Sequence, residues 1–219
     1  MSTVRENITL KELGDIVKRM RVVVINTTTR TLPDHTVIRK PSWDYSFGEG
    51  HLVEALGTPT ADGMVFITIE HLNEAVRLPE YSCYDIDSFW KLAENNTMAC
   101  LRFDPLEENG FPGDPLTLAE VCSRLCLWRD TIIMLTNASK FFGAGSFAVA
   151  EPLFKRLANA LKDDIYIIPS SVHEVLLIAH AQIRGREDAL PSFIEEVNAT
   201  EVCPTEVLGD RPYVFKYKR

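Results

Sequence analysis

The segment from Thr131 to Ala181 constrains the fold more strongly than any other part of this chain. It contains two short apolar runs, Ile132–Leu135 and Ile165–Ile168, and such runs are typical of strands that are buried on both faces. Between them, apolar residues recur at three- and four-residue steps, so we expect one helix over about 145–162. A strand, a helix and a strand in this order predict a right-handed βαβ crossover over 131–168 that joins parallel strands.

Strand-like and helix-like segments alternate along the rest of the chain, without the strict repetition of a doubly wound fold. The predicted helices cover 10–20, 70–78, 85–97, 117–126 and 190–197, and the further strands cover 22–25, 64–69, 100–103, 175–179 and 213–217. Thr-x-x-Glu capping boxes at Thr9 and Thr117 mark the start of two of these helices. The sequence therefore predicts an α+β fold with a mixed β-sheet of about five or six strands flanked by helices.

The length of 219 residues favours one domain, because a chain of this size can bury a substantial core. We expect residues 1–62, an N-terminal helix, strand and long loop, to belong to the same domain as the α+β part at 63–219. The turn-rich stretch 26–61 is predicted as a loop, either a decorated surface or a lid that binds a partner. Trp43 and Tyr45 are its candidate contact residues.

The formal net charge of -8 disfavours nucleic acid as a partner, since phosphates attract clustered Lys and Arg. No apolar run approaches the roughly 18 residues that span a bilayer, so no membrane partner is expected.

Five scattered cysteines indicate reduced thiols and a cytoplasmic location. Cys122 and Cys126 lie one helical turn apart, but no further ligands complete a zinc set, so we expect no metal and no cofactor. A helix start at Gly143–Gly145 could hold an anion, although it lacks the signatures of a phosphate loop.

The second apolar run leads into Pro169-Ser170-Ser171-Val172-His173-Glu174. Pro169 is predicted to end the strand, and Ser171 and Glu174 fit a capping box at the start of a helix. The apolar run that follows is typical of a strand, although a helix continuing from the cap fits it as well. The motif also contains the residue types of a nucleophile, a base and an orienting carboxylate. We favour the structural interpretation, because such relays are normally assembled from separate elements. His173 also fits a buried, hydrogen-bonded histidine or a titrating switch.

Several segments together resemble a bacterial family of unknown function, the family numbered 5688 among the domains of unknown function, which is common in gut Firmicutes. The segments that carry the resemblance are 66–72, 93–97, 134–137, 143–144, 168–175, 197–198 and 206–210. The resemblance covers roughly 63–217 and does not extend to the first sixty residues. It implies an α+β fold and a bacterial cytoplasmic setting, and the family carries no settled activity.

The first functional hypothesis is a non-enzymatic binding or regulatory protein that contacts a protein partner. Its acidic surface and the 26–61 stretch would form the contact, with Trp43 and Tyr45 as aromatic anchors. Asn137, Ser170 and His173 are the further candidate binding residues.

The alternative hypothesis is a hydrolase that uses a Ser/His/Glu cluster. Ser170 or Ser171 would be the nucleophile, His173 or the distant His180 the base, and Glu174 the orienting carboxylate. Asn137 would donate to the oxyanion, because parallel strands would bring Asn137 and Ser170 to the same edge of the sheet.

Overall fold

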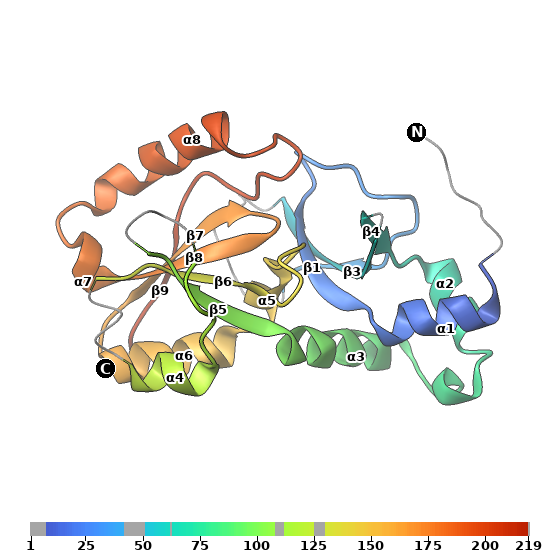
Figure 1. The fold of residues 1–219 in the computed structure, drawn as a ribbon. Helices are drawn as coiled ribbons and strands as arrows, with labels where there is room; N and C mark the ends of the chain where they lie inside the picture. Colours follow the sequence, from blue (N-terminus) through green and yellow to red (C-terminus); the bar gives the residue numbers. More distant parts are fainter. Residues whose placement is uncertain (1–7, 42–50, 62, 108–111, 125–129, 219) are drawn as a thin grey trace.

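The computed structural model describes residues 8–41, 51–61, 63–107, 112–124 and 130–218, without the side chain of Leu118. The chain forms two β-sheets with helices packed around them (Figure 1), which confirms the predicted α+β class. The four-stranded sheet contains β1 (Arg21–Asn26), β2 (Ile38–Arg39), β3 (Leu52–Thr60) and β4 (Gly63–Phe66). In it β3 is central, because β1 pairs with one side of β3 while β2 and β4 pair with the other, always antiparallel.

The five-stranded sheet contains β5 (Leu101–Pro105), β6 (Ile133–Asn137), β7 (Ile165–Ser171), β8 (Glu174–Ala179) and β9 (Tyr213–Phe215). Its order is β5-β6-β8-β7-β9, and each neighbouring pair is antiparallel. The prediction of a mixed sheet is therefore wrong, because every neighbouring pair is antiparallel. The crossover predicted over 131–168 does join parallel strands, since β6 and β7 point in the same direction, with β8 between them.

The single helix predicted over 145–162 is also wrong, since two helices occupy it, α5 (Gly145–Ala148) and α6 (Glu151–Leu161). Pro152 explains the break, because a proline is tolerated in the first turn of a helix but clashes with the preceding turn in its interior.

The remaining helices are α1 (Leu10–Lys18), α2 (Ile69–Ala75), α3 (Ile86–Ala99), α4 (Leu118–Ser123), α7 (His180–Ile183) and α8 (Leu190–Thr200), with short 3-10 turns at Pro79–Tyr81 and Glu187–Ala189. The capping boxes predicted at Thr9 and Thr117 are both confirmed. In Figure 1, α4 and α6 lie on one side of the five-stranded sheet and α8 lies on the other. No helix in the described ranges is both long and apolar enough to cross a bilayer.

The stretch 26–61 is not the long loop that its sequence predicts. β2 and β3 lie within it, and the nine residues of β3 pair with three other strands. Trp43 and Tyr45 lie outside the described residues. The predicted division at residue 62 falls between β3 and β4, which pair as a hairpin, and it stays a prediction.

One hydrophobic cluster contains residues from both sheets. It includes the buried side chains of β1, Phe103 of β5, and Phe147 and Phe154 of the crossover helices. β1 packs against α3 and α5, and α5 also packs against β6 and β8, so α5 contacts both sheets. A smaller cluster joins β7 and β8 to Leu190 and Ile194 of α8. The polar motif at 169–174 lies at the turn between β7 and β8.

Candidate functional site

The Pro-Ser-Ser-Val-His-Glu motif forms the tip of a β-hairpin. Ser171 of β7 pairs with Glu174 of β8, and Val172 and His173 make the turn between them. The predicted capping box is wrong, because the residues after Glu174 pair with both β6 and β7 and tertiary pairing outweighs the local helix signal. Pro169 does not end its strand. It lies where the register shifts between Ile168 and Ser171, and such irregularities are among the few places where a sheet tolerates proline.

Both serine hydroxyls of the motif are directed at one carboxylate. Ser170 Oγ donates to Glu174 Oε1 at 3.0 Å, and Ser171 Oγ donates to the same oxygen at 2.8 Å. Ser171 Oγ also accepts from the backbone N–H of His173 at 3.0 Å, which closes the turn. The serine pair and Glu174 therefore form a local hydrogen-bond network of a kind that fixes a tight turn.

His173 joins the hairpin to two distant segments. Its Nδ1 accepts from the backbone N–H of Phe142 at 3.1 Å, and its Nε2 lies 3.2 Å from Glu206 Oε1. An Nδ1 that accepts an N–H carries no proton, so the hydrogen-bond network assigns the neutral ring its proton on Nε2. The backbone carbonyl of His173 accepts from Thr136 Oγ1 at 2.8 Å. The sequence predicts neither Phe142 nor Glu206 as a site residue, although Glu206 lies in a segment that carries the family resemblance.

Asn137 is bonded within the loop that follows β6. Its Oδ1 accepts from the N–H and the hydroxyl of Ser139 at 3.0 and 2.7 Å, and its Nδ2 donates to the Phe141 carbonyl at 2.9 Å. The predicted approach of Asn137 and Ser170 is realised only in part. Their strands end on the same side of the sheet, but β8 lies between them. The hydrogen bonds of Asn137 thus stabilise the loop in which Phe142 contacts His173.

This loop adopts an uncommon backbone conformation. Lys140 and Phe142 have φ values of 51° and 50°, in the left-handed region that costs a non-glycine residue of the order of 1–3 kcal/mol. The N–H of Phe142 bonds to His173, and its ring lies 6.2 Å from that of Phe66 and 4.9 Å from the Arg30 guanidinium. The surrounding contacts therefore hold Phe142 in this conformation.

Gly143 lets the loop pass directly against the hairpin turn. A Cβ atom there would lie 2.2 Å from Thr136 Oγ1 and 2.3 Å from the His173 carbonyl oxygen. α5 follows at once, is only four residues long, and has a buried start. There is therefore no space for the anion that the sequence allows at Gly143–Gly145, because protein atoms occupy this end of α5.

His180, the other predicted base, lies at the opposite end of β8, about 20 Å from Glu174 at the usual rise per strand residue. Its Nε2 is 2.7 Å from Glu187 and its Nδ1 is 3.4 Å from Asp163. The hydrogen bond from His180 contributes to the lowered pKa of Glu187, after the larger effect of the Glu187 backbone N–H. The structure does not bring His180 to the serines.

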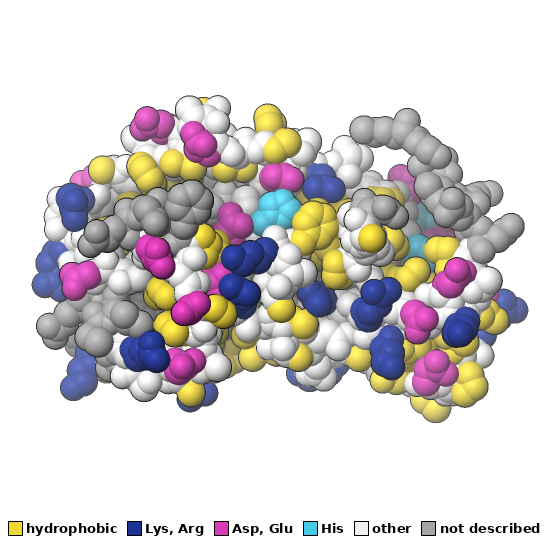
Figure 2. Space-filling model, in the orientation of Figure 1, with side chains coloured by type: hydrophobic (Ala, Val, Ile, Leu, Met, Phe, Trp, Pro, Cys, Tyr) yellow, Lys and Arg dark blue, Asp and Glu magenta, His cyan; other side chains and the backbone are white. Residues whose placement is uncertain are grey.

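Figure 2 shows histidine, acidic and basic side chains gathered near the middle of one face. Among the described residues no group of three or more His, Cys, Asp and Glu side chains is arranged to hold a metal ion. Cys126, the predicted neighbour of Cys122, lies outside the described ranges.

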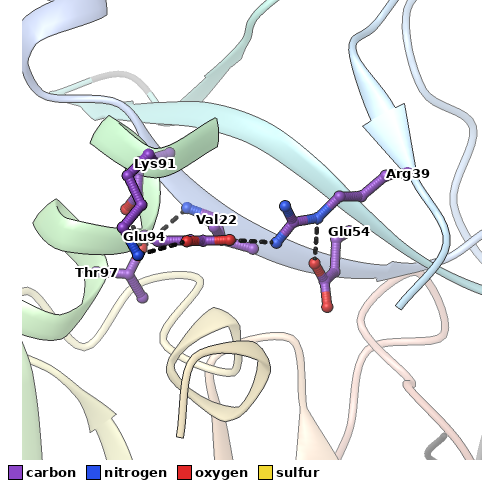
Figure 3. Close-up of polar contacts among 7 residues, drawn as sticks. Val22, Arg39, Glu54, Lys91, Glu94 and Thr97 are labelled. Atoms are coloured by element: carbon purple, nitrogen blue, oxygen red, sulfur yellow. Dashed lines mark hydrogen bonds and ion pairs between the residues drawn. The ribbon is translucent and has the colours of Figure 1, made fainter. Parts of the chain in front are cut away.

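A second polar cluster, around Arg39, is not predicted by the sequence. Arg39 Nε bonds to Glu54 at 2.7 Å, and its Nη2 bonds to Glu94 at 2.8 Å (Figure 3). The guanidinium carbon lies 4.1 Å above the ring of Trp90. Burial lowers the pKa of Arg39, but the hydrogen bonds to Glu94 and Glu54 outweigh it and the net pKa is raised. This cluster ties β2 and β3 to α3.

We expect Ser171→Ala to lower the free energy of unfolding by about 1 kcal/mol, because two hydrogen bonds of the turn are lost. Ser170→Ala is the matched control, since it removes only one, and its effect should be smaller. Urea denaturation of both variants measures the difference. Equal stability of Ser171→Ala and the unmodified protein would contradict the structural role of this hydroxyl.

The chain matches the model of a family of unknown function, DUF5688, over residues 85–217. The match covers more than half of the chain, begins at the N-cap of α3 and ends just after β9. It thus includes the hairpin motif, the loop around Phe142 and Glu206, and it starts later than the resemblance expected from residue 63. No curated protein and no solved structure matches the chain. The chain therefore belongs to DUF5688, a family of unknown function.

Proposed function

We propose that this chain is a non-enzymatic binding protein that contacts a protein partner at β2. The observation that carries the proposal is Ile38, whose side chain is 51% exposed on a two-residue strand at the edge of the four-stranded sheet. A few residues further on, the sequence supplies Trp43 and Tyr45, which are residue types that anchor interfaces. An exposed edge strand followed by aromatic residues suits a protein contact.

The contacts of the hairpin motif favour binding over hydrolysis. A serine hydrolase requires a histidine nitrogen that accepts the proton of the serine hydroxyl. Here the two ring nitrogens of His173 face Phe142 N and Glu206, and the hydroxyls of Ser170 and Ser171 face Glu174. These groups hold the hairpin in place, so they support a structural role for the motif in a binding protein.

The net charge and the cysteines support the kind of partner and the cellular compartment that we propose. The net charge of -8 favours a partner that presents a basic surface over one that presents phosphates. The cysteines of the described ranges, Cys83, Cys100, Cys122 and Cys203, are free thiols. Free thiols suit a reducing compartment, so we place the protein in the cytoplasm.

The contact is tested by quantitative affinity capture with variants of the proposed surface. We expect the Trp43→Ala/Tyr45→Ala variant to bind its partner about tenfold more weakly or worse, because buried aromatic anchors carry most of an interface's free energy. Ile38→Thr should also weaken binding, while keeping a β-branched residue in β2.

Phe193→Ala is the matched control, because Phe193 is 56% exposed on α8, which packs against β7 of the other sheet. Circular dichroism confirms that each variant folds. If the same protein were captured equally by all three variants, the β2 surface would not be the contact.

A further inference from the structure

A groove with a volume of about 420 Å³ lies between α6 and β9. Tyr213 and Phe215 of β9 line one side of it, and Lys155 and Asn159 of α6 line the other. Lys218, just after β9, also lines it. β9 is the last strand in the order of its sheet, so the groove runs along a sheet edge.

The aromatic part of the groove is fixed by the core beneath it. The Tyr213 ring lies 6.1 Å from the ring of Phe147, and the Phe215 ring lies 6.0 Å from the ring of Phe154. Both aromatic side chains of β9 are partly buried, and Phe147 and Phe154 are fully buried. The groove therefore offers a preformed apolar surface, which lowers the entropy cost of binding an apolar side chain.

The rim of the groove is basic although the chain as a whole is acidic. Three lysines, Lys155, Lys216 and Lys218, line it together with one acid, Glu151, whereas the chain has 31 acidic and 23 basic residues. A local reversal of sign on an acidic protein directs negatively charged groups to that place.

Asp164 holds the basic tail against the sheet. Its carboxylate accepts from Lys216 Nζ at 2.8 Å and from the backbone N–H of Tyr217 at 2.8 Å. The hydrogen bond to Asp164 also raises the pKa of Lys216, so this lysine stays charged. Lys216 is thereby neutralised in part by Asp164, and Lys155 and Lys218 supply the exposed positive charge at the groove.

We propose that the groove between α6 and β9 binds an extended acidic segment of a protein partner. An apolar side chain of the segment packs on Tyr213 and Phe215, and flanking carboxylates contact Lys155 and Lys218. A peptide fits better than a nucleic acid, because the net charge of -8 repels a long polyanion more than a segment with a few carboxylates. This site goes beyond the proposed contact at β2, and each surface can bind without the other.

The test is a fluorescence anisotropy titration with a labelled ten-residue peptide of alternating Glu and Val. We expect saturable binding to the unmodified protein and no saturation with the peptide in which Lys replaces Glu. Lys155→Glu/Lys218→Glu should weaken binding of the acidic peptide at least tenfold. Lys11→Glu/Lys18→Glu, which makes the same charge change on α1, should alter the affinity by no more than twofold.

Chemical-shift mapping on the unmodified protein provides a test that requires no variant. The acidic peptide should shift the amide signals of Lys155, Tyr213 and Phe215, and leave those of β2 unchanged. The proposal is overturned if the acidic peptide fails to bind, or if it binds equally to the groove variant. The proposal is likewise overturned if an oligouridylate binds at these residues more tightly than the acidic peptide, because the ligand would then be a nucleic acid. A failure here leaves the β2 contact standing, because Ile38 is not among the residues that line the groove.

Discussion

Gly145→Ala is expected to destabilise the protein by about 3 kcal/mol or more, because this position has no space for a methyl group. A Cβ atom would lie 1.9 Å from the carbonyl oxygen of Val22 and 3.1 Å from the Cα atom of Val23. These are backbone atoms of β1, so no flexible side chain can move aside. Either α5 or β1 must shift, and β1 packs on both α3 and α5.

Gly14→Ala is the matched control in another helix. Its new methyl group would meet Leu78 Cδ1 at 3.1 Å, the end of a flexible side chain, while alanine improves helix propensity by up to about 1 kcal/mol. Urea denaturation of both variants should show a large loss for Gly145→Ala and a small change of either sign for Gly14→Ala. Similar changes in the two variants would show that α5 does not press against β1.

Arg39→Met is expected to lower the free energy of unfolding by about 3–5 kcal/mol, because it removes the guanidinium that neutralises a buried carboxylate. The side chain of Glu54 is completely buried, and Arg39 joins it to Glu94. Arg39 also contributes its stacking on Trp90, which the methionine side chain replaces only in part. Chemical denaturation measures the loss.

Two further variants separate the buried charge from a general surface effect. Arg39→Met/Glu54→Met should be more stable than Arg39→Met alone, since it also removes the buried carboxylate that Arg39 neutralises. Arg77→Met removes the partner of Glu74 in an exposed ion pair, with side chains 67% and 50% exposed, and should cost less than about 1 kcal/mol. Equal losses for Arg39→Met and Arg77→Met would contradict the role of the Arg39 cluster in joining β2 and β3 to α3.

Local sequence patterns predict much of the secondary structure. The capping boxes at Thr9 and Thr117 are confirmed, because their hydrogen bonds join residues three positions apart and depend on little else. The apolar runs of β1, β6 and β7 are confirmed for a similar reason, since burial on both faces leaves a continuous hydrophobic signal.

The central strand β3 could not be recognised in this way. Glu54, Gly57 and Pro59 lie within it, and these residue types are depleted in strands. Two of them are accommodated by tertiary contacts: Glu54 bonds to Arg39, and Gly57 faces Met64, whose sulfur would lie 2.8 Å from a Cβ atom. The position of β8 between β6 and β7 also could not be predicted, because the spacing of apolar residues does not show which strands pair.

The candidate site was predictable in its residues but not in its contacts. Ser170, Ser171, His173 and Glu174 do share one hydrogen-bonded cluster, as their spacing in sequence implies. The partners of the His173 ring lie about thirty residues away in both directions, at Phe142 and Glu206. The spacing in sequence therefore indicates where the polar groups gather. The contact of the His173 ring with the loop at Phe142, instead of with a serine, depends on the tertiary fold.

The protonation of the His173 ring tests most directly whether the motif holds the fold or carries out hydrolysis. Long-range ¹H–¹⁵N correlation spectra at neutral pH distinguish a protonated ring nitrogen from an unprotonated one. We predict that Nε2 carries the proton and Nδ1 is unprotonated, and that the Phe142 amide, which donates to Nδ1, exchanges slowly with solvent. A proton on Nδ1, with Nε2 unprotonated and a rapidly exchanging Phe142 amide, would contradict the structural role of His173.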